Sequence, residues 1–361
     1  MSACDAPAAA VEDGPQGAVS RRGLDHPFGR WAPPADRPFE VAPGIQWVRM
    51  PMPGSLDHIN LWLLDDADEA GPGTAIVDTG MNVPMCRAVW EALLPGRRIT
   101  RIICTHLHPD HIGLAGWLSH RSGARVHMSR DEYLLARVLQ LRPLESPPDE
   151  ALAYVTAAGW PEDWIAAFRN TRWNYFATNT TPLPGSYHRL EEGDELHIGA
   201  RRWRVTIGSG HSPEHVCLVD HEGGVMISGD QVLPRITPNV SVNVMEPRGD
   251  PLGNWLDSLR AFLSLPADVL VLPAHGYPFH GLHERLRQII AGHEERLALL
   301  QDFCRTPRTV HDCLPRLFGA RLNDSNRFMA TGEAFAHLRR LQRQALVVAE
   351  RRGAALHFHT A

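Results

Sequence analysis

The chain has no lysine: all 36 basic residues among its 361 residues are arginines. Catalysis by a lysine Schiff base or a lysine general base is therefore excluded. Any anionic substrate group must be held by arginine, histidine, backbone amides or metal. The six cysteines show no CxxC pair and no regular spacing. Cys104 and Cys217 lie in apolar runs where buried free thiols are expected, and this cysteine usage favours a reducing cytoplasm.

The sequence also leads us to expect neither a membrane segment nor a secretory leader. No run of about 18 or more apolar residues occurs, so no membrane span is expected. The first residues, MSACDAPAAAVEDGPQGAVSRRG, lack an apolar core and carry acidic residues early, unlike a secretory signal. Their alanine, proline and glycine content predicts a flexible tail over residues 1–40.

Charge is unevenly spread along the chain. Residues 281–361 carry 13 arginines against 8 acidic residues, a balance of +5, and the remainder carries 23 against 33, a balance of −10. The C-terminal excess permits an anionic partner there. The negative balance of the remainder makes a poor surface for RNA, so nucleic acid is not the expected partner.

From residue 44 onward, short apolar runs alternate with helical patterns, which predicts an α/β layered sandwich over residues 41–280. Within it, residues 128–188 form a helical insertion rich in large aromatics, among them Trp164, Trp173 and Tyr175. Two interpretations stay open for these aromatics. They either pack on the core, or line a lid whose inner face receives a substrate acyl chain.

The pattern of predicted elements changes after residue 281. Three helical stretches and a terminal strand pair predict a small winged-helix-like module over residues 281–361. Modules of the winged-helix type commonly serve in dimerisation or packing, so a homodimer is one arrangement this module would allow.

Earlier in the chain, Ser129 and Glu132 have the spacing of a helix capping box, which predicts that a helix begins after Ser129.

The run 105-THLHPDHIG-113 concentrates four strong ligand donors within six residues: His106, His108, Asp110 and His111. The first two histidines point the same way if the preceding strand extends to them. Asp110 and His111 then fall on the turn into a helix. Imidazole nitrogens and carboxylate oxygens suit two adjacent metal ions, with zinc as the typical case.

Three lone donors share one local pattern, in which an apolar strand-like run ends at a potential ligand. His211 follows RRWRVTI, Asp230 follows VMISG, and His275 follows VLVLPA. Each alone would be an ordinary loop residue. Together, at strand ends of an α/β protein, they indicate a shared site with the histidine-rich run.

The motifs THLHPDH, GHSPEH, SGDQ and PAHG, with IVDTG upstream, resemble the metallo-β-lactamase-fold hydrolase superfamily over about residues 44–280. His211 and Asp230 resemble the glyoxalase II and lactonase branches in particular. The resemblance implies an αββα sandwich. It also implies two divalent metal ions, zinc first, with manganese or iron as the other options.

By resemblance, one ion is held by His106, His108 and His211. The other is held by Asp110, His111 and His275, with Asp230 bridging both. Asp78, in IVDTG, matches the aspartate that orients the ligand loop. Apart from the resemblance, His215 in GHSPEH has two interpretations, a hydrogen-bond donor behind the ligands or, more commonly, a structural histidine. Asp110 and Asp230 are then the catalytic carboxylates around a hydroxide that bridges the ions.

The expected reaction is hydrolysis of an acyl bond, a thioester or ester, in a small-molecule substrate. A glutathione thioester fits poorly, because the glyoxalase II branch binds glutathione through a C-terminal region that uses lysine. Alternatives are an endoribonuclease or other phosphodiesterase, a lactonase and an iron-dependent persulfide dioxygenase. His58 and Asn60, in LDHINLW, alternate on one strand face, where they either line the pocket or form hydrogen bonds within the sheet edge. Arg235 is close enough in sequence to Asp230 to reach a substrate carboxylate or phosphate, although most arginines in such positions make structural loop contacts.

Overall fold

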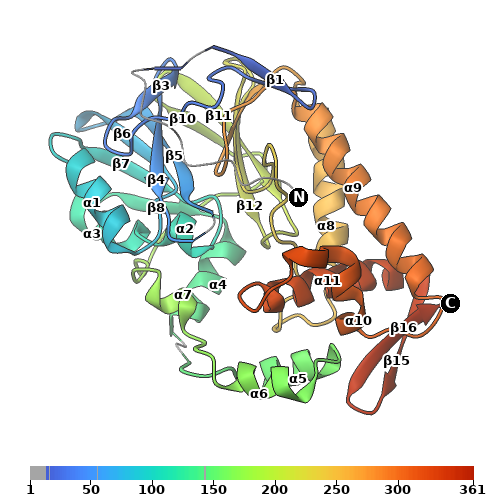
Figure 1. Ribbon diagram of the computed structural model, residues 1–361. Coiled ribbons are helices and arrows are strands. Elements are labelled where there is room, and N and C mark those ends of the chain that lie inside the picture. The colour runs from blue at the N-terminus through green and yellow to red at the C-terminus, as the bar shows by residue number, and fades with distance from the viewer. Residues whose placement is uncertain (1–13, 16, 55, 142–143) are drawn as a thin grey trace.

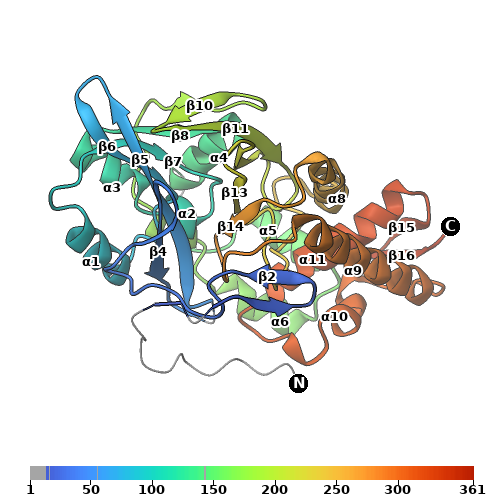
Figure 2. The same ribbon diagram turned by 90° about the horizontal axis from the view of Figure 1, so that it is seen from above.

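The computed structural model describes residues 14–15, 17–54, 56–141 and 144–361. Two sheets lie face to face between outer helices (Figures 1 and 2). The αββα sandwich predicted from the sequence is confirmed. The strands of the seven-stranded sheet, in spatial order, are β3 (Phe39–Ala42), β4 (Ile45–Pro51), β5 (His58–Asp68), β6 (Gly71–Val77), β7 (Ile99–Ile103), β8 (Arg125–Met128) and β9 (His188–Arg189).

The second sheet has five strands and ends in a parallel pair. In spatial order its strands are β10 (Glu195–Ile198), β11 (Arg201–Gly208), β12 (His215–Asp220), β13 (Val225–Gly229) and β14 (Leu270–Pro273). Both faces of β12 and β13 are buried, which is why these strands have continuous apolar sequences rather than alternating ones.

Helices cover the outer face of each sheet, and two further helices lie away from both sheets (Figure 1). Those beside the first sheet are α1 (Pro84–Leu93), α2 (Pro109–Ile112), α3 (Ala115–Ser122), α4 (Arg130–Leu141) and α7 (Tyr175–Thr178). The others are α5 (Asp149–Ala157), α6 (Glu162–Arg169), α8 (Pro251–Ala261), α9 (Leu282–Phe303), α10 (Val310–Phe318) and α11 (Arg327–Arg343), with 3-10 turns at Phe262–Ser264 and Gly319–Arg321. Among the described residues, no helix is both long and apolar enough to cross a membrane.

The core has three layers that match this arrangement. Between the sheets, Trp47, Trp62 and Trp203 are almost fully buried among aliphatic side chains. A second cluster packs the first sheet against α1, α3 and α4. A third joins the second sheet to α8, α9, α10 and α11. Cys104 and Cys217 are free and buried, as expected.

The N-terminal stretch differs from the prediction of a flexible tail to residue 40. Residues 1–13 and 16 lie outside the described part. Beyond them, β1 (Val19–Arg21) and β2 (Leu24–His26) form a hairpin. Leu24 is buried, and Asp25 pairs through its backbone with His280. The prediction is therefore wrong for this hairpin, because a few apolar and backbone contacts fix it to the second half of the chain.

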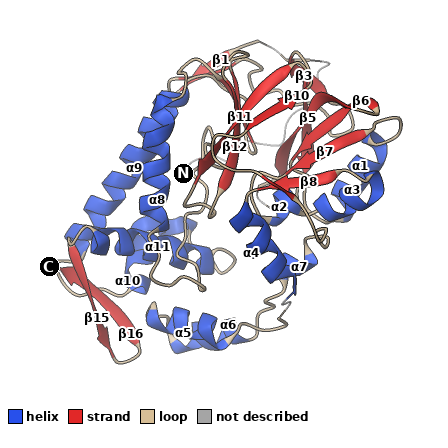
Figure 3. Cartoon of the chain, turned by 180° about the vertical axis from the view of Figure 1, so that it is seen from behind, coloured by secondary structure: helices blue, strands red, loops and turns tan. Residues whose placement is uncertain are grey.

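The insertion divides between two neighbours. Helix α7 packs against α4 beside the first sheet, whereas α5 and α6 lie below α10 and α11, away from both sheets (Figures 1 and 3). Trp160 donates from Nε1 to Thr331 Oγ1 of α11 at 2.9 Å. Phe168 stacks on Phe328 with ring centroids 5.2 Å apart. The α5–α6 part thus belongs to the core of the C-terminal helices.

The C-terminal part consists of α9, α10 and α11, followed by a hairpin of β15 (Val347–Arg352) and β16 (Ala355–Thr360). Helix α10 begins after Thr309, whose side chain forms a capping box with Asp312. Three helices and a terminal strand pair were expected here. Their assignment to the winged-helix type stays a prediction.

Candidate metal centre

The histidine-rich run lies directly after β7. That strand ends at Ile103, so it does not extend to His106 and His108. The two rings still converge, since His106 Nε2 lies 2.8 Å from His108 Nδ1. Asp110 and His111 lie inside the short helix α2 rather than on a turn before it.

His211, from the loop between β11 and β12, completes the first donor group. Its Nε2 lies 3.0 Å from His108 Nδ1 and 3.2 Å from His106 Nε2. Tetrahedral zinc with Zn–N bonds of about 2.0–2.1 Å separates neighbouring nitrogens by about 3.4 Å. The three nitrogens are slightly closer than that, and they suit one ion.

A second donor group consists of Asp110, His111 and His275. Asp110 Oδ2 lies 3.5 Å from His111 Nε2 and 3.4 Å from His275 Nε2. All three come from the carboxyl ends of parallel strands, because α2 follows β7 and His275 follows β14. Such ends meet at one edge of a sheet sandwich, where sites are usually built.

Asp230 lies between the two groups. Its Oδ1 is 3.3 Å from His275 Nε2, and its Oδ2 is 3.4 Å from His211 Nε2. One carboxylate oxygen therefore faces each group. The structure brings all seven predicted ligands together in the arrangement that a bridging carboxylate requires.

Asp78 fixes the orientation of His111. The Nδ1 of His111 donates to Asp78 Oδ2 at 2.7 Å, which leaves Nε2 facing the site. Asp78 also accepts from the backbone N–H and the hydroxyl of Thr105. Its φ of 60° lies in the left-handed region, which is uncommon for a residue other than glycine. Strained backbone of this kind is found at sites held in place by their surroundings.

Two more ligand rings are oriented by backbone carbonyl groups. His275 Nδ1 donates to the carbonyl of His58 at 2.8 Å, and His211 Nδ1 donates to the carbonyl of Asn239 at 2.8 Å. Each bond fixes which ring nitrogen is left for a metal. Asn239 had no recognisable signal in the sequence, because a backbone acceptor can be any residue.

His215 lies behind the ligands, where its Nε2 accepts from the backbone N–H of Asp230 at 3.0 Å. It also stacks on His106, with centroids 4.7 Å apart. Gly229 permits this approach, because a Cβ at that position would lie 2.5 Å from the His215 ring. His215 thus accepts a hydrogen bond from the backbone of Asp230 and has none of the described hydrogen bonds to a ligand side chain, which agrees with the structural interpretation.

Several buried atoms of the site have no protein partner. Among the described residues, His111 Nε2, His275 Nε2 and Asp230 Oδ1 are buried without a hydrogen bond. Buried polar atoms normally have partners, and all three point into the space between the two donor groups. The donor set therefore fits two divalent cations.

Burial and charge set the protonation of the site. Burial, followed by the charge of His211, lowers the pKa of His108 to about 3. Burial also opposes protonation of His111, but the carboxylates of Asp78, Asp110 and Asp230 outweigh it and hold that pKa well above its usual range. Burial also lowers the pKa of His106 well below its usual range, so His106 and His108 are neutral, whereas carboxylates lie around the second group. Cations are the natural counterpart of these buried carboxylates.

Glu132 is a site residue that the sequence reasoning misassigned. Its carboxylate is fully buried and does not cap α4; it accepts from the backbone N–H of Leu107 and that of Glu214, both at 2.9 Å. Ser129 donates to the Glu214 carbonyl. The capping-box prediction is wrong because these bonds to the two ligand loops replace it. Burial raises the pKa of Glu132 to about 7.

His58 and Asn60 hold the His275 loop. The Nε2 of His58 accepts from the backbone N–H of Gly276 at 2.8 Å. Asn60 is buried and donates to the carbonyls of Pro273 and Gly276. These bonds use the polar atoms with which the two residues were expected to meet a substrate. Their observed role is to support the loop.

The remaining residues that were predicted to bind substrate lie in different parts of the structure. Arg235 is exposed and lies near His26. Trp164 packs against the C-terminal helices, with the Arg327 guanidinium 3.6 Å from its ring centroid. Trp173 packs edge-on against Phe328. For both tryptophans the packing interpretation is the one the structure bears out.

Tyr175 is different. Its side chain, on α7, is 60% exposed. Burial of the hydroxyl and the negative charge of Asp110 raise its pKa. Tyr175 is therefore largely open to solvent, and the charge of Asp110 acts on its hydroxyl.

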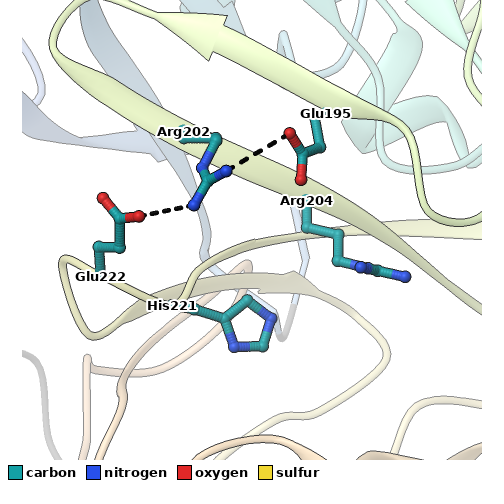
Figure 4. A pocket seen from close by; sticks show the side chains of 5 residues that line it. All are labelled: Glu195, Arg202, Arg204, His221 and Glu222. Atoms are coloured by element: carbon teal, nitrogen blue, oxygen red, sulfur yellow. Dashed lines mark hydrogen bonds and ion pairs between the residues drawn. The ribbon is translucent and has the colours of Figure 1, made fainter.

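A hollow of about 320 Å³ lies elsewhere, on the outer surface of β10 and β11. In it Arg202 lies between Glu195 and Glu222 and pairs with both (Figure 4). In these exposed ion pairs the charge of Arg202 is balanced by the two glutamates. None of the seven ligands lines the hollow, so it is separate from the metal centre.

Residues 55–275 match the family described as the metallo-beta-lactamase superfamily. Residues 297–360 match a family described as metallo-beta-lactamase-like, C-terminal domain. The first match covers more than half of the chain and contains all seven predicted ligands. The chain belongs to the metallo-beta-lactamase superfamily, and it is a hydrolase of that superfamily with a candidate site for divalent metals.

Relatives that match nearly the whole chain have general names, whereas a relative that matches about half of it is named for a specific activity. A solved structure of a beta-lactamase domain protein from Burkholderia ambifaria is 37% identical, with a TM-score of 0.87 over 94% of this chain and 98% of that one. The probable metallo-hydrolase YqjP of Bacillus subtilis is 23% identical, over 87% of this chain and 97% of its own. The acyl-coenzyme A thioesterase MBLAC2 of Gallus gallus is 26% identical over 52% of this chain, which spans only 63% of that relative.

Proposed function

We propose that the protein hydrolyses acyl thioesters, with an acyl-CoA type of substrate as the leading class. The observation that carries the proposal is the position of Asp230 between the two donor groups, together with three buried atoms, His111 Nε2, His275 Nε2 and Asp230 Oδ1, that have no hydrogen-bond partner among the described residues. When bound there, two divalent ions supply a hydroxide nucleophile at neutral pH and polarise the scissile carbonyl.

The side chains around this centre have separate tasks. Asp110, whose pKa is about 2 because His111 and His275 outweigh its burial, stays ionised and accepts a hydrogen bond from an attacking water. Asp78 and the carbonyls behind the other rings keep the ligand nitrogens aimed at the site. Burial of these donors excludes bulk water and strengthens each electrostatic contact.

An apolar surface on α4 agrees with an acyl substrate. Glu132 of this helix binds both ligand loops, and the opposite face of the helix exposes an apolar stripe at helical spacing: Leu134, Val138 and Leu141. The stripe extends roughly 10 Å along the helix. Neighbouring Tyr175 adds an exposed ring. An exposed apolar row of this kind suits an alkyl chain, and the name of the MBLAC2 relative agrees with this substrate class.

The test is thiol release from acyl-CoA and glutathione thioesters of increasing chain length. We expect turnover of acyl-CoA substrates that rises with chain length and is lost in Asp110→Asn. A matched control is Asp68→Asn, an exposed aspartate on β5 that pairs with Arg98, and it should retain wild-type turnover. Failure of the fully metallated protein to release thiol from any of these substrates would overturn the proposal, and lactones and phosphodiesters would be assayed next.

A further inference from the structure

The segment between β13 and α8 connects two parts of the metal centre. It begins with Asp230, which spans both donor groups, and its residue Asn239 supplies the carbonyl that accepts from His211 Nδ1 at 2.8 Å. We refer to residues 231–242 as the orienting loop. Within its described structure the loop forms no helix or strand of its own, so other elements must hold it.

Helix α9 holds the first half of the loop. Arg285 is only 7% exposed, and its guanidinium donates to two loop carbonyls, from Nε to Leu233 at 2.6 Å and from Nη2 to Ile236 at 2.8 Å. A buried arginine is costly unless its donors are used. These two bonds therefore fix the path of the chain directly after Asp230.

Helix α11 holds the second half. The Nδ2 of Asn239 lies 3.4 Å from the Met329 carbonyl and 3.4 Å from Glu333 Oε2, and the backbone N–H of Val242 donates to the Gly332 carbonyl at 3.1 Å. The helix can approach this closely because residue 332 has no side chain. A Cβ there would lie 2.7 Å from both Cβ and Oγ of Ser241.

The contacts run in one chain from the C-terminal helices to a ligand: α11 to Asn239, and Asn239 to His211. We propose that the C-terminal helices are a positioning device for the ion held by His106, His108 and His211. Asn239 and Gly332 are then positioning residues, since they touch neither metal nor substrate. This role depends on the metal centre but not on which bond the enzyme cleaves, so it can fail or hold independently of the thioesterase proposal.

The experiment measures metal affinity rather than turnover. Zn²⁺ is titrated into metal-free protein against a chromophoric chelator, and the two binding steps are assigned with His211→Ala, which removes the step of its own site. In Gly332→Ala we expect that same step to weaken by about 10- to 100-fold, the usual effect of disturbing a residue behind a ligand, with the other step unchanged.

The matched control is Gly292→Ala in α9, where an added Cβ meets nothing within 4 Å. It makes the same change in a neighbouring helix and should keep both steps. A second pair serves if Gly332→Ala does not fold. Asn239→Ala should weaken the His211 step, and Asn243→Ala should not, because the Asn243 side chain binds only the local Met245 N–H among the described contacts. Equal affinities within both pairs would overturn the proposal.

Discussion

Asp78 is the residue that most directly orients the His111 ring of α2 toward the candidate metal site. Its carboxylate binds His111 Nδ1 and both donors of Thr105. Asparagine tolerates its positive φ but can offer only one oxygen. We expect Asp78→Asn to lower metal affinity by about 10- to 100-fold, measured by chelator competition. Unchanged affinity would show that Thr105 and the helix suffice to orient His111.

Two aromatic residues of the insertion should respond in opposite ways. Trp164→Leu removes the contact with Arg327 and should lower the unfolding free energy by about 1–2 kcal/mol, with KM for an acyl thioester unchanged. Tyr175→Ala removes an exposed ring near Asp110 and should raise KM without loss of stability. Urea unfolding and initial rates separate these effects. A raised KM in Trp164→Leu would restore the substrate role predicted from the sequence.

For single residues, the sequence predicted the candidate ligands better than it predicted the residues that orient those ligands. The seven candidate ligands could be named because their motifs resemble a known family and each lies after an apolar strand, and the structure brings them together. Asn239 acts through its backbone, which no residue type marks. Glu132 has the spacing of a cap, and only the fold reveals that two distant loops compete for its carboxylate. The direction in which Trp164 faces depends on α11, which lies far away in sequence.

Between elements, helices α9 and α11 bury two stacked histidines. His293 Nδ1 lies 3.1 Å from His337 Nε2. Burial lowers the pKa of His293 to about 3 and that of His337 to about 4, below the value near 6.5 of an unfolded histidine. The unfolded chain therefore takes up protons first, and stability that is full above pH 6.5 is lost as the pH falls towards 4.

We expect the unfolding free energy to fall by about 2 kcal/mol per histidine between pH 7.5 and pH 5. Urea unfolding of the wild type and His337→Gln at both pH values measures the share of one ring. The variant should show the smaller decrease. Equal decreases in the two proteins would mean that His337 does not contribute to acid sensitivity.

Element types were predictable where apolar runs are long, as in β12 and β13. Element ends were less so, because they depend on partners that are remote in the chain. The helix expected after His111 is two helices, α2 and α3. The tail expected up to residue 40 contains a hairpin, because its backbone pairs with His280.

For the whole molecule, metal binding and folding should be coupled. The three apolar clusters do not include the ligands, so the metal-free protein should fold. An ion that binds only the folded state adds about 2.7 kcal/mol per site at one hundred times its Kd. We expect the thermal midpoint to rise with added Zn²⁺ in the wild type and to rise less in His211→Ala. A midpoint that is independent of metal would contradict a resident metal centre.

The chain of contacts from His106 through His211 and Asn239 to Met329 also has a consequence for biosynthesis. A ribosome adds about 5–20 residues per second, so the first histidine of the site emerges many seconds before helix α11 does. During the last part of that interval residues 231–242 have been synthesised, but the helix that supports them has not. We therefore expect the site of His211 to reach its final geometry only after α11 has been synthesised, and metal to bind most tightly to the completed polypeptide.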